Sequence, residues 1–155
     1  MTAELSTSYI DIDAAPERVW EVLTDVSAWP QWNRFVTAAE GRFAVGELVS
    51  LEVPKLSPAL RTSLRLTVLE VDPLRRLRFG LSLARLGLPS LFSTEHTLTL
   101  SIEEDAVRLW EGALFRGLLV PLVSRSLNRR YISAFDATNV ALKNRIEALP
   151  PVRPA

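Results

Sequence analysis

The sequence predicts an α+β fold in which a seven-stranded antiparallel sheet wraps around a long C-terminal helix, with two short helices after the first strand. Three features of the sequence predict this fold. The chain opens with one alternating strand pattern followed directly by a helical pattern. It continues through short alternating segments separated by turns, and it closes with a long stretch of apolar residues at helical spacing.

The N-terminal part indicates a strand followed by two helices. Over residues 5–12 the side chains alternate, which puts Ser8 and the isoleucines on the face that we expect to be buried. Pro16 fits the first turn of a helix, because its missing N–H needs no partner there. A second short helix is predicted over 27–33, and its Trp32 is the tryptophan that we expect beside an interior cavity.

The middle of the chain predicts six further strands. Turn-forming residues such as Asp72–Pro73 separate them, and consecutive strands joined by short turns pair most simply as an antiparallel meander. The strands are expected at 35–43, 47–54, 61–71, 76–83, 92–102 and 106–115.

The last segment, 118–148, is predicted to be one amphipathic helix. Apolar residues recur at three- and four-residue steps from Leu119 to Ile146, and charged residues occupy the opposite face. The chain shows no repeat, no low-complexity segment and no linker. We therefore expect one domain over 1–149 and a disordered tail over 150–155.

Composition and charge limit the classes of function. Eighteen basic residues balance eighteen acidic ones, which gives no electrostatic case for nucleic acid. One histidine and no cysteine give no reason to expect a zinc or copper site, and no cofactor is expected. No secretory signal is visible, and the apolar run GLLVPLV is far too short to span a bilayer. We expect a cytoplasmic monomer or weak homodimer without stable membrane insertion.

Two common catalytic patterns are missing from the sequence. It contains no GxSxG elbow of a serine hydrolase, and no glycine-rich phosphate loop follows a strand. The basic segments SLRL and LRRLRF alternate with core residues, so they indicate a solvated sheet face.

Two long stretches of the chain resemble a known superfamily. The opening IDIDAAPERVWEVLTDVSAWPQWN, residues 10–33, is similar to the first elements of the START-like superfamily, the helix-grip proteins also called SRPBCC. The closing FRGLLVPLVSRSLNRRYISAFDATNVALKNRIEAL, residues 115–149, resembles the last helix of members described as polyketide cyclase/dehydrase-like. The resemblance covers essentially the whole chain. It implies the helix-grip fold and says little about the ligand, because the pocket residues of this family vary freely.

The resemblance also implies a pocket between the sheet and the last helix. Its ligand would be a small hydrophobic molecule such as a lipid, a polyketide-like aromatic or an isoprenoid. Combined with strand and helix alternation, it predicts a lining made of Trp32, Phe35, Leu66, Phe79, Leu81, Leu88, His96, Leu98, Leu109, Glu111, Phe115, Leu119, Leu127, Tyr131 and Phe135.

His96, the single histidine, is predicted to face this interior together with Glu111. It lies on the apolar set of its strand, because its neighbours at steps of two include Leu98. A hairpin closing around Glu104–Asp105 pairs residues whose numbers sum to about 209. Residue 98 then lies opposite Glu111, and His96 and Glu111 become diagonal neighbours that we expect to share a hydrogen bond.

Three roles are open for this pair. A buried His–Glu pair that satisfies itself, or that reaches Arg130 or Tyr131, is purely structural. Alternatively, the pair orients the polar end of an otherwise apolar ligand. In the third role, His96 and Glu111 are the acid and base of a cyclase or dehydratase, since histidine titrates near neutrality.

Two further expectations concern the surface. The apolar loop over 84–91, which contains Leu88, is expected to cover the pocket mouth, near the loop 55–60 and residues 116–118. Trp110 and Leu114 are expected on the outer sheet face, which leaves an interaction or regulatory module as a further alternative.

Overall fold

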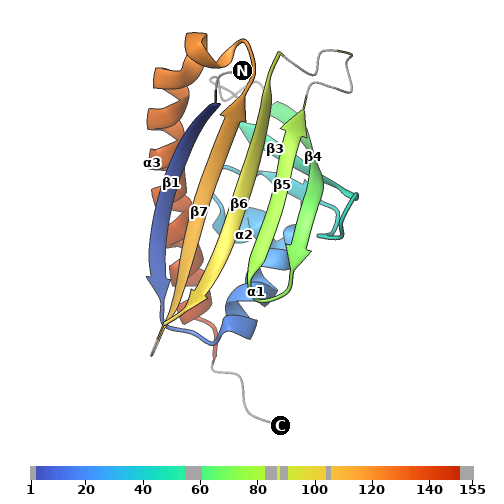
Figure 1. Ribbon diagram of the computed structural model, residues 1–155. Helices are drawn as coiled ribbons and strands as arrows, with labels where there is room; N and C mark the ends of the chain where they lie inside the picture. The colour runs from blue at the N-terminus through green and yellow to red at the C-terminus, as the bar shows by residue number, and fades with distance from the viewer. Residues whose placement is uncertain (1–2, 55–60, 83–86, 88–90, 104–105, 151–155) are drawn as a thin grey trace.

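The predicted α+β architecture is confirmed by the structure, a computed structural model that describes residues 3–54, 61–82, 87, 91–103 and 106–150, with side chains except at 3–6, 54, 61–62 and 122–131. One antiparallel sheet has the strand order β1-β7-β6-β5-β4-β3-β2. The long helix α3 runs behind β1 and β7, and α1 and α2 lie across one end of the sheet (Figure 1). The elements are β1 Ala3–Ile12, α1 Pro16–Thr24, η1 Val26–Ala28, α2 Trp29–Trp32, β2 Ala38–Glu40, β3 Leu48–Pro54, β4 Arg61–Asp72, β5 Arg76–Ser82, β6 Ser93–Ile102, β7 Val107–Arg116 and α3 Val120–Glu147.

The strand expected over 35–43 is limited to Ala38–Glu40. The chain turns before it, because the Phe35 N–H donates to Oδ1 of Asn33 at 2.9 Å and the side chain thereby closes a local turn. This turn leaves Phe35 with 40% of its surface exposed.

The β6–β7 hairpin has the register that the sequence predicts. Leu98 lies opposite Glu111 and His96 opposite Ala113. Alternation then puts Leu98 and Leu109 in the core and Trp110 on the outer face, where 41% of its surface is exposed. The alternation ends at Ile102, which the sequence places with the core leucines but which is 72% exposed at the end of β6.

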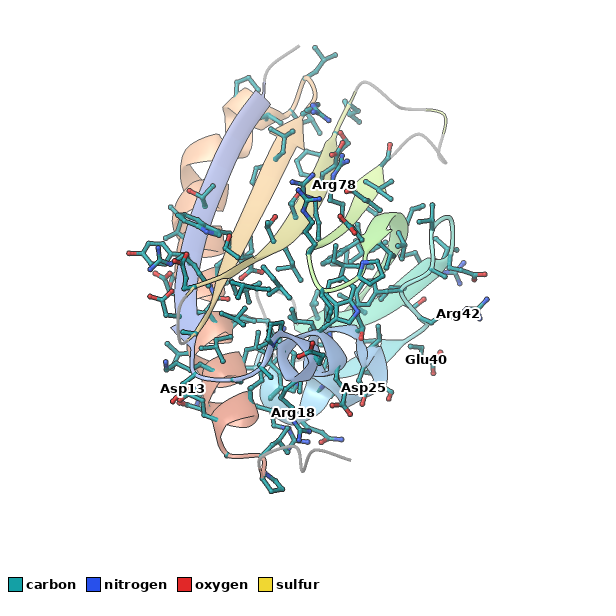
Figure 2. All side chains as sticks on the ribbon, turned by 60° about the horizontal axis from the view of Figure 1, so that its bottom comes forward. Asp13, Arg18, Asp25, Glu40, Arg42 and Arg78 are labelled. Atoms are coloured by element: carbon teal, nitrogen blue, oxygen red, sulfur yellow. The ribbon has the colours of Figure 1, made fainter. Side chains whose placement is uncertain are left out.

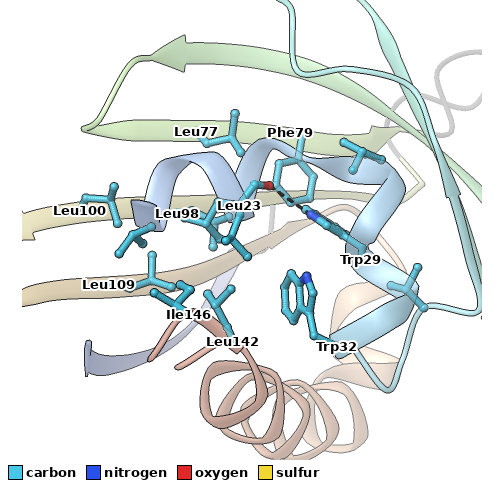
Figure 3. Packing of buried hydrophobic residues seen from close by; sticks show 14 of the residues in the cluster. Leu23, Trp29, Trp32, Leu77, Phe79, Leu98, Leu100, Leu109, Leu142 and Ile146 are labelled. Carbon is cyan, nitrogen blue, oxygen red and sulfur yellow. Dashed lines mark hydrogen bonds between the residues drawn. The ribbon is translucent and has the colours of Figure 1, made fainter. Parts of the chain in front are cut away.

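The core fills the space between the sheet, α1, α2 and the C-terminal half of α3. Trp29 and Trp32 point from α2 into this space (Figure 3), where the Trp29 indole N–H donates to the Leu23 carbonyl at 3.1 Å. Leu142 and Ile146 of α3 are almost completely buried on the opposite side. Burial of each such side chain stabilises the fold by about 1.5–3 kcal/mol, so this cluster fixes how α3 lies on the sheet.

Polar contacts close the seam between β1 and α3. The Lys143 ammonium donates to the Asp11 carbonyl at 2.5 Å, and the Asp13 N–H donates to Oε1 of Glu147 at 2.9 Å. The Ser8 hydroxyl donates to Oδ1 of Asp136 at 2.5 Å. These contacts hold the edge strand β1 along the helix.

The transition from β7 to α3 requires a glycine. Gly117 has a φ of +130°, and a Cβ at this position would lie 2.4 Å from the Leu91 carbonyl oxygen. The same oxygen accepts the Leu119 N–H at 3.1 Å. The described end of the 84–91 loop therefore lies beside the start of α3, as expected.

The outer sheet face carries arginines of the basic segments, and the guanidinium groups of Arg76 and Arg78 are paired with carboxylates there. Arg78, labelled in Figure 2, donates to Glu70 at 3.0 Å and to Glu95 at 2.8 Å, and Glu95 also accepts from Arg116 at 2.6 Å. Arg108 forms a bidentate pair with Asp11. Arg78 and Arg116 hold the pKa of Glu95 below its usual value, chiefly through the hydrogen bond from Arg78.

Some sequence predictions lie outside the described residues. They concern the loop 55–60, Leu88, the hairpin tip Glu104–Asp105, the tail beyond 150, and the side chains of Leu127, Arg130 and Tyr131.

Candidate functional site

Three polar side chains follow one another on the inner face of β6 and β7. Thr94 and His96 are two residues apart on β6, so they point to the same side of the sheet. Glu111 lies on β7, diagonal to His96, because its direct partner is Leu98. The β-sheet therefore presents a hydroxyl, an imidazole and a carboxyl toward α3.

The His96 ring is held between aromatic rings from two elements. It stacks on Phe79 of β5, its direct cross-strand partner, with centroids 5.5 Å apart and planes inclined by 9°. The edge of the Phe135 ring from α3 approaches it at 6.0 Å and 76°. These contacts explain how a flat polar ring is accommodated among apolar side chains.

Burial lowers the pKa of His96 from 6.5 to about 4, because the charged imidazolium is poorly solvated among these rings. The imidazole is therefore neutral at neutral pH. A neutral imidazole has one donor nitrogen and one acceptor nitrogen, so it can bind a carbonyl or a hydroxyl group.

Burial shifts Glu111 in the opposite direction. It raises the pKa of this carboxyl from 4.5 to about 8, and the negative charge of Asp136 contributes in the same direction. Most Glu111 side chains thus carry a proton at neutral pH. The inner face holds a neutral acid and a neutral base side by side.

His96 and Glu111 combine partial solvent exposure with strong desolvation of their charged forms. His96 and Glu111 are each partly accessible to a water-sized probe, yet desolvation dominates both pKa shifts. Both side chains therefore keep some access while their surroundings solvate a charge poorly.

The expected hydrogen bond between His96 and Glu111 is not among those that join the described residues. The Oε2 atom of Glu111 is buried and has no hydrogen-bond partner. The same is true of Nε1 of Trp32, which the sequence placed beside the pocket, and of Oγ1 of Thr94, which sequence reasoning did not single out. Because a buried polar atom without a partner costs about 1–3 kcal/mol, three of them in one domain call for an explanation.

The residues expected to line a pocket fall into three groups. Several are buried in the two core clusters of the described residues, namely Trp32, Leu66, Phe79, Leu98, Leu109, Phe115 and Phe135. Leu81, Leu119, His96 and Glu111 keep partial access, whereas Phe35 points out of the core. Leu88 and the side chains of Leu127 and Tyr131 lie outside the description.

Three polar residues near Glu111 come from β1 and α3, two elements that sequence reasoning did not connect at this site: Ser8, Asp136 and Asn139. Ser8 lies directly opposite Glu111 in the β1–β7 pairing, and its hydroxyl is bonded to Asp136 of α3. The side chain of Asn139, which is only 2% exposed, donates to the same hydroxyl at 3.5 Å. A polar residue among isoleucines on the inward face of β1 is the sequence signal that marks Ser8.

Two open hollows indent the outer face of the sheet, and His96 lines neither. One, of about 340 Å³, lies over β4, β5 and β6 beside Arg65, Gly80 and Glu95. The other, of about 290 Å³, lies beside Trp110, whose ring contacts that of Tyr9 at 4.9 Å. Thr94 is among the residues that line the first hollow and Glu111 is among those that line the second, so each hollow borders one polar residue of the candidate site.

Two further findings concern the described part of the chain only. No group of three or more His, Asp or Glu side chains there is arranged to hold a metal ion. No helix within it combines the length and the apolar character needed to cross a bilayer.

Comparison with protein families gives one match that spans nearly the whole chain. Residues 2–147 match the family described as polyketide cyclase / dehydrase and lipid transport. No curated protein sequence matches the chain.

Solved structures with the same fold come from proteins of low sequence identity. MLL2253 from Mesorhizobium loti has a TM-score of 0.73 at 19% identity, over 95% of this chain and 99% of that one. The di-domain ARO/CYC BexL from the BE-7585A biosynthetic pathway has a TM-score of 0.73 at 15% identity, over 96% of this chain and 51% of its own. Ara h 8.0201 has a TM-score of 0.69 at 9% identity, over 96% and 100%. At such identities the likeness establishes the fold.

Proposed function

The chain belongs to the polyketide cyclase / dehydrase and lipid transport family, and on that premise we propose that it binds a small hydrophobic molecule between the sheet and α3. The predicted lipid, polyketide-like aromatic or isoprenoid ligands all fit this description. The family supports a ligand-binding or cyclase role in general. The ligand class proposed here rests on the side chains of the interior.

One observation carries the proposal: the buried polar atoms that have no hydrogen-bond partner. Oε2 of Glu111, Oγ1 of Thr94 and Nε1 of Trp32 belong to three different elements of the interior. A ligand with polar groups at matching positions would satisfy them, and its apolar remainder would contact the surrounding leucines and phenylalanines. Pockets for small molecules combine an apolar lining with a few placed polar groups in this way.

The charge state of the interior narrows the ligand further. With the pKa of His96 at about 4 and that of Glu111 at about 8, both side chains are uncharged at neutral pH. An ionised ligand group would lack a counter-charge among these side chains, and burying an unpaired charge is costly. The proposed ligand is therefore neutral and carries hydroxyl, carbonyl or ether oxygens.

Mass spectrometry of gently extracted protein tests this proposal. Native spectra should show a bound molecule, and organic extraction should release a neutral, oxygen-containing apolar compound. The variant Leu98→Asp, which puts a charge next to His96 on the inner face, should lose it. Retention of an anionic or strongly basic compound, at equal occupancy in the variant, would contradict the proposal.

A second candidate function is acid–base catalysis of a cyclisation or dehydration. The observation that favours it is the pairing of a neutral imidazole with a protonated carboxyl on one face. His96 would remove a proton next to a substrate carbonyl, while Glu111 would donate a hydrogen bond or a proton to the carbonyl oxygen.

The pH dependence of turnover tests the second candidate. With a linear poly-β-ketone as substrate, kcat should fall below about pH 4, where His96 is protonated, and above about pH 8, where Glu111 is ionised. If the substrate binds but is not converted at any pH between these limits, the catalytic candidate is contradicted and ligand binding remains as the proposed function.

A further inference from the structure

Polar side chains lie between Glu111 and the protein surface along the β1–α3 seam. Ser8 is the direct cross-strand partner of Glu111, so both side chains lie on the inner face, with Cβ atoms about 5 Å apart. The Ser8 hydroxyl donates to Oδ1 of Asp136 at 2.5 Å and accepts from the Asn139 amide at 3.5 Å. Asp136 is exposed, whereas Asn139 is buried.

The carboxyl groups of Asp136 and Glu111 have contrasting surroundings. Asp136 is reached by solvent and accepts a hydrogen bond from Ser8. Glu111 lies in the interior, and its Oε2 accepts no hydrogen bond. A negative charge near a buried carboxyl opposes the ionisation of that carboxyl.

We propose that Asp136 is a positioning residue for Glu111: Ser8 holds it at the seam, where its negative charge adds to the effect of burial and further disfavours the ionised form of the buried carboxyl. The inference deepens the proposed function, because that function requires an uncharged interior. The test of this inference needs no ligand, so the role of Asp136 and the proposed ligand binding can be contradicted independently of each other.

The other described groups around Glu111 do not supply this charge. His96 on β6 is neutral over the relevant range, because its pKa is about 4. Lys143, two helical turns beyond Asp136 on α3, is bonded to the Asp11 carbonyl and to Glu147. Among the described residues, the negative charge of Asp136 acts with burial, the larger cause, to raise the pKa of Glu111.

The test is a titration of the Glu111 carboxyl by infrared or ¹³C NMR spectroscopy of the full chain, with the signal assigned by its loss in Glu111→Gln. In Asp136→Asn the amide oxygen can still accept the Ser8 hydroxyl, so the geometry is kept while the charge is removed. The midpoint of Glu111 should then fall by roughly half a unit to one unit. Ser8→Ala should shift it in the same direction by a smaller amount, because Asp136 is no longer held at the seam.

Glu147→Gln is the matched control, since it removes a carboxylate from the same helix about 16 Å along its axis. Its Glu111 midpoint should equal that of the wild-type chain. If Asp136→Asn folds and leaves the midpoint unchanged, or if Glu147→Gln shifts it equally, the proposal is overturned. If Asp136→Asn does not fold, the variant Asp136→Ser replaces it, because it removes the same charge. An unchanged Glu111 midpoint in that variant would likewise overturn the proposal.

Discussion

At the scale of single residues, the site consists of two ionisable groups whose pKa values are shifted in opposite directions. Burial lowers the pKa of His96 and raises that of Glu111, so both side chains avoid a charge. The consequences for stability have opposite signs. Between about pH 4.5 and 6.5 the two effects oppose each other, and a single-residue variant separates them.

Replacement of Glu111 by Gln should make the protein more stable in alkali than the wild type. The folded pKa of Glu111 is raised, so its contribution is fully present below about pH 4.5 and is lost as the pH rises through about 8. The upper bound of this loss is on the order of 5 kcal/mol, and partial solvation reduces the expected effect to about 2 kcal/mol. Urea unfolding at about pH 5 and about pH 9 measures it. An equal change at both pH values would show that the carboxyl does not titrate as proposed.

Replacement of His96 by Phe should keep the fold and remove sensitivity to acid. The site already holds a flat ring against Phe79 and Phe135. The folded pKa of His96 is lowered, so the wild-type contribution is present above about pH 6.5 and is lost as the pH falls to about 4. The variant should therefore gain about 1–2 kcal/mol relative to wild type near pH 4, in denaturant unfolding curves. A variant that is less stable at every pH would contradict this account of the ring environment.

At the scale of elements, short-range patterns in the sequence predicted most of the fold. The strand register expected for the β6–β7 hairpin, in which paired residue numbers sum to about 209, placed His96 and Glu111 correctly. A tight turn fixes the register of both strands. The shortening of the strand after α2 was missed, since the Asn33 turn that turns Phe35 outward depends on one side-chain hydrogen bond. The link from Ser8 to Asp136 joins residues 128 positions apart, and strand alternation alone cannot find it.

The junction between β7 and α3 should be sensitive to a single added methyl group. In Gly117→Ala the alanine would have to adopt an unfavourable positive φ. Its Cβ would also lie 2.4 Å from the Leu91 carbonyl oxygen. We expect a loss of more than about 2 kcal/mol in the free energy of unfolding. Gly46→Ala is the control, because Gly46 has a φ of +85° but nothing within 4 Å of the added Cβ. Equal losses in both variants would mean that the close approach at Leu91 has no energetic effect.

At the scale of the whole molecule, the fold places a nearly apolar interior between a curved sheet and one long helix. Family membership and the fold agree with such an interior. The charged side chains gather elsewhere, on the outer face and at the β1–α3 seam. The protein is thus expected to hold a neutral ligand between about pH 4 and about pH 8, where both interior groups are uncharged.

The most direct measurement of this claim is the binding of a neutral apolar fluorophore, N-phenyl-1-naphthylamine, to the wild-type chain and to Glu111→Gln at about pH 7 and about pH 9. If the fluorophore binds only when Glu111 is protonated, a pKa of about 8 predicts a roughly tenfold weaker affinity at the higher pH. The affinity of the variant should be the same at both pH values. Wild-type affinity that does not change with pH, or an equal change in the variant, would contradict the proposal that Glu111 faces the ligand.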